Sequence, residues 1–331
     1  MTQSAAFWHP LDNGQVACDL CPIDCRLREG QTGPCASRAN HAGQMVPLHY
    51  GRIVSSALDP IEKKPLYHFH PGKPILSVAA PGCNLHCMFC QNWTISQNGD
   101  ARTMKMSPSD LAAMAQAEES VGVAFTYSEP LVWFEFVRDT ARLVREKGLK
   151  NVLVTNGYLN PEPLAELLPL IDAANIDLKS MDDVFYRKVC KARLEPVLAA
   201  IRQFHAAGVH LEITNLLIPG HNDTDDQITA LVDFVAALDT NIALHFSAYR
   251  PAWKLNAPPT PLETLLRAKE LADEKLKFVY LGNVQTSAGR DTVCPDCGKV
   301  VIERSGYQSA AKFIKGDICP GCSSRFPGLV C

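Results

Sequence analysis

The chain has 331 residues, of which 47% are hydrophobic and 20% are charged, and its formal net charge is -3. These values predict a globular chain with one large domain and smaller appendages, and they give no reason to expect a nucleic-acid partner. No apolar run approaches the roughly 18 to 20 residues of a membrane span, and the first thirty residues lack a signal-peptide pattern. We therefore expect a cytoplasmic protein without a membrane partner.

Thirteen cysteines divide the chain into three predicted parts. A chain without a signal peptide does not reach an oxidising compartment, so we expect metal ligands rather than disulfides. Cys190 lies outside the clusters and is predicted to be a buried thiol. The parts are residues 1–73 with Cys18, Cys21, Cys25 and Cys35, residues 74–285 with Cys83, Cys87 and Cys90, and residues 286–331 with Cys294, Cys297, Cys319 and Cys322.

The N-terminal set has the spacing Cys18-x2-Cys21-x3-Cys25-x9-Cys35. Four thiolates can close a structural zinc site or hold a second [4Fe-4S] cluster. The uneven spacing, with Pro22 after the second cysteine, slightly favours zinc over the cluster.

Short β-branched apolar runs alternate with amphipathic helical stretches between about residues 74 and 285, a pattern typical of parallel βα units. Six units are too few for a closed eight-stranded barrel, so the candidates are an open six-unit barrel and a doubly wound sheet. The predicted strands are 75–80, 122–127, 151–155, 174–179, 210–218 and 242–247, with 277–281 as a further strand.

Polar or glycine-bearing turns follow each predicted strand, as in Pro81-Gly82-Cys83 and Asn156-Gly157. In a βα barrel these strand ends share one face, on which active sites are built. The sequence therefore predicts an α/β fold with a partial, TIM-like (β/α)6 barrel, flanked at both ends by a small four-cysteine metal module.

A loop with the spacing C-x3-C-x2-C follows the first of these strands and contains Cys83, Cys87 and Cys90. Three thiolates leave one position of a metal centre without a protein ligand, whereas structural zinc sites have four ligands. His86 adjoins Cys87 and is expected to point elsewhere. A cubane iron-sulfur cluster with one open iron fits this loop better than zinc.

This loop, with Phe89 before its last cysteine, resembles the signature of the radical S-adenosylmethionine (SAM) enzymes. Residues 82–93, together with residues 59–68, resemble the AmmeMemoRadiSam-system branch, which is related to the pyruvate formate-lyase activating enzymes. The resemblance implies a [4Fe-4S] cluster on the three cysteines and SAM on its open iron. It further implies reductive cleavage of SAM to a 5'-deoxyadenosyl radical, which abstracts hydrogen from a substrate.

The resemblance also implies cofactor contacts near the second strand. Phe89 is expected beside the adenine, and Glu129 is expected to contact the amino group of SAM, with Ser128 allowing a close backbone approach. The alternative for this segment is a helix N-cap at Ser128, followed by Pro130 in the first turn.

Further contacts are implied at Thr155, Asn156, Asp177 and Lys179, which match the activating-enzyme pattern after the third and fourth strands. Activating enzymes commonly place an Asp before Thr-Asn-Gly to help hold a monovalent cation. Val154 stands at that position here, so the sequence puts a cation site in doubt.

The fifth and sixth strands add two candidates for cofactor binding. Either Asn215 or Lys179 is expected to help with the carboxylate of SAM, in place of an arginine that related enzymes often have on the fifth strand. His245 is a candidate for contact with adenosine or substrate, although a single histidine on a strand is more often a structural residue.

The C-terminal cysteines form two C-x2-C knuckles, Cys294-x2-Cys297 and Cys319-x2-Cys322, about twenty residues apart. This spacing predicts a zinc-ribbon-like module, with a rubredoxin-like mononuclear iron as the alternative. The basic residues around the knuckles are too dispersed for nucleic-acid binding.

Three functions follow from these motifs. The favoured one is a radical SAM enzyme acting on a small or medium molecule, with an electron donor such as flavodoxin or ferredoxin and with Memo-like and AMMECR-like partner proteins. The second is an activating enzyme that makes a glycyl radical on a protein partner, a glycyl radical enzyme. The third, a non-catalytic metal-binding interaction protein, is disfavoured by the open site in the cysteine loop.

Overall fold

The core of the protein is one eight-stranded sheet, seen in a computed structural model that describes residues 4–310 and 316–330. Its strand order is β15-β14-β13-β12-β11-β10-β8-β7, and every pair is parallel except β7 with β8. The strands are β7 (Ser55–Pro60), β8 (Pro74–Ala79), β10 (Gly122–Phe125), β11 (Lys150–Thr155), β12 (Ala173–Asp177), β13 (His210–Leu217), β14 (Ala243–Ala248) and β15 (Val279–Gly282).

All seven predicted strands are present, and their order decides between the two predicted folds. Within this sheet the strands from β8 to β15 follow one another in chain order, without the reversal of strand order that defines a doubly wound sheet. The open βα barrel is therefore confirmed. Strand β7 was not predicted, and its antiparallel pairing with β8 extends one edge of the sheet.

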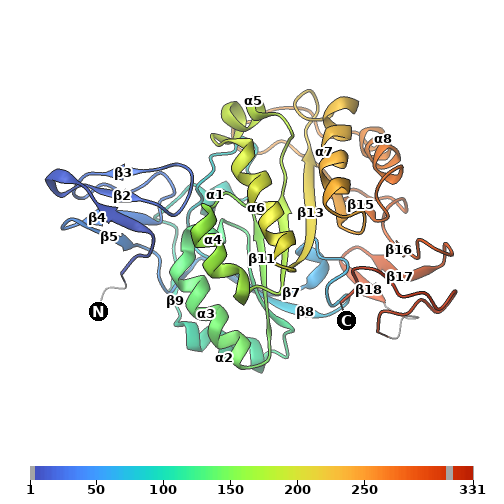
Figure 1. The fold of residues 1–331 in the computed structure, drawn as a ribbon, viewed down its shortest axis with the longest axis horizontal. Coiled ribbons are helices and arrows are strands. Elements are labelled where there is room, and N and C mark those ends of the chain that lie inside the picture. Colours follow the sequence, from blue (N-terminus) through green and yellow to red (C-terminus); the bar gives the residue numbers. More distant parts are fainter. Residues whose placement is uncertain (1–3, 311–315, 331) are drawn as a thin grey trace.

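Helices cover the outer face of this sheet (Figure 1). The longer helices bury apolar residues against the strands, and two of them begin with capping boxes, Ser107 with Asp110 and Thr224 with Gln227. The helices are α1 (Trp93–Ser96), α2 (Pro108–Ala117), α3 (Phe134–Glu146), α4 (Pro161–Leu167), α5 (Asp183–Phe185), α6 (Leu194–Ala206), α7 (Asp225–Leu238) and α8 (Leu262–Asp273). None of the helices in the described ranges is long and apolar enough to cross a membrane.

Short strands at the N-terminal side form a separate layer, at the left end of Figure 1. Arg38 ties this layer to α3 through a buried ion pair with Glu135, and its Nη1 donates to the Ala6 carbonyl at 2.7 Å. The strands are β1 (Trp8–Pro10), β2 (Val16–Cys18), β3 (Arg26–Leu27), β4 (Arg38–His41) and β5 (Gln44–Pro47), followed by β6 (Arg52–Ile53), which pairs with β9 (Met104–Lys105).

The C-terminal segment packs at the opposite end of the molecule, against β15 and the connection between β7 and β8 (Figure 1). Arg304 Nη2 donates to the Tyr67 carbonyl at 2.9 Å, and Val330 forms a β-bridge with Phe69. Its strands are β16 (Thr292–Val293), β17 (Val300–Ser305) and β18 (Gln308–Ala310).

Gly82 lies where the N-terminal layer meets the barrel, directly before Cys83. Its φ is +104°, and an added Cβ would lie 2.4 Å from the Cys35 carbonyl oxygen and 2.3 Å from Ser37 Oγ. We expect Gly82→Ala to lower the free energy of unfolding by about 2–3 kcal/mol in urea titrations, because of the backbone clash and the unfavourable φ.

The matched control for that change is Gly208→Ala. Gly208 also has a positive φ of +72°, but an added Cβ there meets no atom within 4 Å. Its cost is expected to be about 1 kcal/mol, from the backbone conformation alone. Equal losses for the two variants would show that the contact with Cys35 does not constrain Gly82.

Candidate active site

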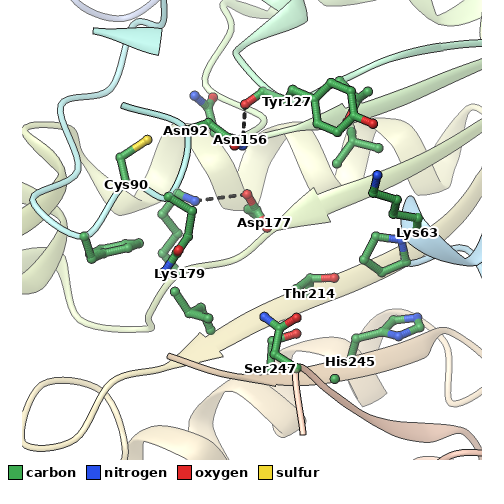
Figure 2. A pocket seen from close by; sticks show the side chains of 18 of the residues that line it. Lys63, Cys90, Asn92, Tyr127, Asn156, Asp177, Lys179, Thr214, His245 and Ser247 are labelled. Carbon is green, nitrogen blue, oxygen red and sulfur yellow. Dashed lines mark hydrogen bonds and ion pairs between the residues drawn. The ribbon is translucent and has the colours of Figure 1, made fainter. Parts of the chain in front are cut away.

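A cavity of about 800 Å³ opens at the carboxyl ends of the parallel strands. Figure 2 shows side chains from several strands and from the cysteine loop around it. Of the predicted site residues in the barrel, all but Asn215 line this cavity: Cys83, Cys87, Phe89, Cys90, Ser128, Glu129, Thr155, Asn156, Asp177, Lys179 and His245.

The cysteine loop is held in place by backbone hydrogen bonds to a short π-helix, Tyr186–Cys190, before α6. The His86 N–H donates to the Cys190 carbonyl at 2.9 Å, and the Met88 N–H donates to the Val189 carbonyl at 3.0 Å. The His86 ring is hydrogen-bonded to Gln97 rather than directed at the three thiols, as predicted. The loop therefore presents three sulfur atoms to the cavity without a histidine as fourth ligand.

Polar groups surround two of these sulfurs. The Leu85 N–H lies 3.3 Å and Asn156 Nδ2 lies 3.6 Å from Cys83 Sγ, and Ser96 Oγ lies 3.2 Å from Cys90 Sγ. Burial raises the pKa of Cys83 and of Cys90, so these thiols need a bound metal to become thiolates at neutral pH. Hydrogen bonds to sulfur are typical of iron-sulfur sites, and the donor set fits a cluster with one open iron.

Glu129 links the end of β10 to the end of β11 through hydrogen bonds. It accepts hydrogen bonds from the Thr155 hydroxyl at 2.6 Å, the Asn156 N–H at 2.8 Å and the Leu131 N–H at 2.9 Å. Burial raises the pKa of Glu129 to about 7, although the three hydrogen bonds oppose this rise. The carboxyl group therefore changes charge near neutral pH beside the cysteine loop.

The predicted N-cap at Ser128 is wrong, because Glu129 is the N-cap of the short 3-10 helix Pro130–Trp133. The Ser128 hydroxyl instead donates to the Ala80 carbonyl at 2.5 Å and ties this turn to the end of β8. Glu129 thus both caps the helix and lines the cavity, since a carboxylate can accept several hydrogen bonds.

Lys179 places its ammonium group against Asp177, with Nζ 3.1 Å from the carboxylate (Figure 2). The same Nζ lies 5.7 Å from the centre of the Phe89 ring. Val154 lines the cavity on the neighbouring strand and offers no oxygen ligand. An ammonium group thus neutralises Asp177 on the side of the cavity where the sequence put a cation site in doubt.

The structure does not bring Asn215 to the cavity. Its side-chain amide donates to the Leu178 carbonyl at 2.7 Å, while the preceding residue, Thr214, lines the cavity. Thr214 pairs in register with Asp177 on one side and with His245 on the other (Figure 2). Side chains alternate along a strand, so a shift of one residue exchanges the two faces.

His245 is held by Glu212, a residue that the sequence analysis missed. Its Nε2 lies 2.6 Å from Glu212, which also accepts from His210 and from the backbone N–H groups of Tyr67 and His68. Burial disfavours the charged carboxylate, but the hydrogen bonds from His210 and His245 hold the pKa of Glu212 well below its usual range. The signal in the sequence was a glutamate among the apolar residues of a predicted strand, and the structure buries this side chain fully.

The lead-in segment forms a second buried network at the cavity wall. Lys64 Nζ donates to Asp59 at 2.7 Å and to the Tyr127 hydroxyl at 3.2 Å, and Tyr127 is also hydrogen-bonded to Asp59. Lys63 lines the cavity and binds the other oxygen of Asp59 at 2.9 Å. This network fixes the segment before β8 against the end of β10.

The C-terminal cysteines form a compact group. Their four sulfur atoms all lie within 4.8 Å of one another, with Cys294 and Cys322 3.8 Å apart and Cys297 and Cys319 3.7 Å apart. A tetrahedron with metal–sulfur bonds of about 2.3 Å has edges of about 3.8 Å. The group therefore fits one tetrahedral metal ion, and we predict zinc.

We expect Cys319→Ala to lose about one zinc ion per chain, because three thiolates cannot close a structural site. The Gly321 N–H lowers the pKa of Cys319 to about 6, which favours its thiolate. Elemental analysis of the purified variant and wild type measures this loss. Iron in place of zinc would support the rubredoxin-like alternative, and an unchanged metal content would contradict both.

Comparison with known proteins gives three findings. A family model described as the radical SAM superfamily matches residues 77–235. The chain is 44% identical to the uncharacterized protein MJ0808 of Methanocaldococcus jannaschii, with 98% of each chain aligned. It is 27% identical over 160 residues to the pyruvate formate-lyase 1-activating enzyme of Escherichia coli, an alignment that covers 46% of this chain and 65% of that enzyme.

Among solved structures, that of Streptococcus suis SuiB bound to precursor peptide SuiA aligns with a TM-score of 0.51 and 18% identity. The alignment covers 69% of this chain and 52% of SuiB. At this identity the likeness concerns the fold alone.

Proposed function

Because the chain belongs to the radical SAM superfamily and is an enzyme of that class related to the pyruvate formate-lyase activating enzymes, we propose that it abstracts hydrogen from a small or medium molecule in the 800 Å³ cavity. Cys83, Cys87 and Cys90 would hold the [4Fe-4S] cluster. When bound, this cluster and SAM supply a 5'-deoxyadenosyl radical through one-electron cleavage of the cofactor. The observation that carries the proposal is the single cavity shared by the three thiols and the strand ends.

The residues of this chain bind and orient the cofactor and exclude water. Glu129 and Asn156 lie beside Cys83, where they would receive the amino group of SAM, and Phe89 would lie against the adenine. Lys179 brings positive charge to the same wall for the carboxylate of SAM, although Asp177 shares its ammonium group. Ser128 and Thr155 place the backbone and Glu129 at this edge of the cavity.

Glu129 makes the binding of SAM depend on pH. Since its pKa lies at about 7, the carboxylate that accepts from the amino group is lost as pH falls. We expect wild-type affinity for SAM to weaken roughly tenfold from about pH 7.5 to about pH 6, measured by equilibrium dialysis with the cluster-loaded protein.

Glu129→Gln is neutral at every pH, so its affinity should be low and should not improve as pH rises. The control is Glu118→Gln, at an exposed position after α2, which should keep the wild-type pH profile. A Glu129→Gln variant that retains the wild-type profile would place the titrating group elsewhere.

The size of the cavity favours a small second molecule over a protein loop. Pockets for small ligands measure about 300–1,000 Å³, and this cavity, part of which the cluster on the three thiols would fill, lies within that range. The C-terminal segment contributes Arg290, Ser305 and Tyr307 to its wall. The second candidate, an activating enzyme for a glycyl radical enzyme, is favoured by the relatives of that class.

The proposed pathway context follows from the resemblance of residues 59–68 and 82–93 to the AmmeMemoRadiSam branch. In that setting Memo-like and AMMECR-like proteins would be the partners, and flavodoxin or ferredoxin would supply the electron. A location of the protein in the cytoplasm would agree with its need for such electron donors.

The test is anaerobic reconstitution with iron and sulfide, followed by dithionite and SAM, with 5'-deoxyadenosine measured by mass spectrometry. Formation above the level without protein is expected, and its absence would overturn the proposal. Deuterium-labelled cell extract, separated into low-mass and protein fractions, then distinguishes the candidates. Deuterium transfer into 5'-deoxyadenosine from the low-mass fraction supports a small substrate, and transfer from the protein fraction supports an activating enzyme.

A further inference from the structure

We propose that Cys18, Cys21, Cys25 and Cys35 hold a second iron-sulfur cluster of the cubane type, next to the cysteine loop of the barrel. The identity of this cluster is independent of the proposed function. Its part in electron transfer rests on that function. The proposal reverses the slight preference for zinc that the sequence spacing gave.

All four cysteines line one small cavity of about 20 Å³, which can hold one water-sized sphere. Most of the other lining residues are apolar, including Leu20, Ile23 and Leu27. A zinc ion bound at about 2.3 Å to four thiolates leaves no void between them. A cubane instead places a core of iron and sulfide between its thiolates, which therefore lie farther apart than around a single ion, and a space lined by all four cysteines agrees with that arrangement.

The C-terminal site provides an internal comparison. Its four sulfurs lie within 4.8 Å of one another, and this is the one such group of three or more metal-binding side chains in residues 4–310 and 316–330. The N-terminal thiols are therefore more widely spread, as are those of Cys83, Cys87 and Cys90. Neither the N-terminal set nor the loop set contains three sulfur atoms within 4.8 Å of one another, unlike the set that fits a single metal ion.

Arg38 places a buried guanidinium group beside the same cavity. The residue is 1% exposed, it lines the cavity, and its Nη1 lies 3.8 Å from Cys18 Sγ. Its buried Nε has no hydrogen-bond partner among the described residues. A buried donor left unpaired is costly, and the bridging sulfides of a cubane would add acceptors beside the thiolates, which are the acceptors that a four-cysteine zinc site offers.

The N-terminal cavity shares a wall with the cysteine loop. Asn84 lines that cavity and accepts a hydrogen bond at 2.9 Å from Asn156 Nδ2, which also lies 3.6 Å from Cys83 Sγ. The Cys35 carbonyl approaches Gly82, and Ser37 Oγ donates to the Pro81 carbonyl at 3.2 Å. Asn84, together with the contacts of Cys35 and Ser37 with Gly82 and Pro81, thus links the N-terminal cysteine set to the cysteine loop.

This position gives the electron for SAM cleavage a short route. One electron leaves the second cluster, which is oxidised, and enters the loop cluster, which is reduced, and no bond forms or breaks in this transfer. A low-potential one-electron carrier protein, flavodoxin or ferredoxin, would then reduce the second cluster again.

Two variants of the full chain separate the sites. The loop variant removes the three loop ligands through Cys83→Ala, Cys87→Ala and Cys90→Ala. The N-terminal variant removes two N-terminal ligands through Cys18→Ala and Cys35→Ala. After anaerobic reconstitution, iron, acid-labile sulfide and zinc are measured for each variant. The loop variant is expected to keep about four iron and four sulfide per chain at the N-terminal site. Zinc at the C-terminal site serves as the internal control for folding.

A loop variant that contains zinc at two sites, and neither iron nor sulfide, would overturn the proposal. Iron without sulfide would also overturn it, because a mononuclear site would then be present. This result does not depend on SAM cleavage, so failure of the proposed function and failure of the second cluster are distinguishable. If the N-terminal variant does not fold, the loop variant alone decides the identity of the cluster.

Low-temperature electron paramagnetic resonance of the dithionite-reduced proteins tests the proximity of the two clusters. Two reduced clusters in contact broaden each other's signals, so the wild-type spectrum is expected to differ from the sum of the spectra of the two variants. A wild-type spectrum equal to that sum would overturn the electron route.

Discussion

Replacing Cys87 with alanine is expected to abolish formation of 5'-deoxyadenosine, down to the level measured without protein. The loop has three thiolates and no histidine to replace a lost one, since His86 is bound to Gln97. Two thiolates cannot hold a cubane whose fourth iron must stay open. Reconstituted iron should fall by about four atoms per chain, the content of one cluster.

The matched control is Cys190→Ala. Cys190 is a fully buried thiol beside Cys87, but it lies outside the C-x3-C-x2-C motif and contributes its backbone carbonyl to the loop through His86. Its side chain can be removed without removing that hydrogen bond, so this variant should bind iron as the wild type does. Loss of the cluster in Cys190→Ala, with retention in Cys87→Ala, would mean that the ligands are misassigned.

Replacing Glu135 with alanine is expected to lower the free energy of unfolding by about 3–5 kcal/mol. The side chains of Glu135 and Arg38 are 1% and 2% exposed, and their ion pair joins α3 to the N-terminal layer. Glu135 also accepts a hydrogen bond from the Ala6 N–H at 2.8 Å. Without the carboxylate, a buried guanidinium group loses its counter-charge and the Ala6 N–H loses its acceptor.

Urea unfolding followed by circular dichroism measures this loss. The control is Glu146→Ala at the exposed end of the same helix, where a surface change is expected to cost about 0.5 kcal/mol or less. Glu135→Gln keeps the shape and an acceptor, so it separates charge from hydrogen bonding. Equal stability of Glu135→Ala and Glu146→Ala would show that the ion pair does not hold the N-terminal layer in place.

The strands and the cysteine loop were predictable because their signals are local. A β-branched run marks a strand over a few residues, and three cysteines at fixed spacing supply three ligands within one loop. Glu129 and Asn156 could be found for the same reason, since each follows a strand at the end where barrel sites form. Strand β7 escaped because its residues, Ser55–Pro60, lack a strong apolar alternation.

The structure places Thr214 at the cavity instead of the predicted Asn215, and local sequence signals could not have shown this. Both are polar, neighbouring and on the same strand, and the choice between them depends on register with β12 and β14. The buried network of Glu212 with His210 and His245 depends on the same pairing, because those residues come from two strands. A one-residue shift would exchange the face of every side chain on the strand.

The sequence by itself determined the class of the barrel, the three cysteine sets and the open position in the central one, because each depends on residues close together in the chain. Tertiary structure decided which side chains share the cavity, which carboxylates are buried, and how far apart the sulfurs of each set lie. The spacing of cysteines in the sequence shows how many ligands each set offers. The distances between their sulfur atoms depend on how the surrounding segments pack. For this reason the sequence showed only that each outer set offers four thiolates, and the folded chain separated a tight tetrahedron at the C-terminal end from a more widely spaced set beside the barrel.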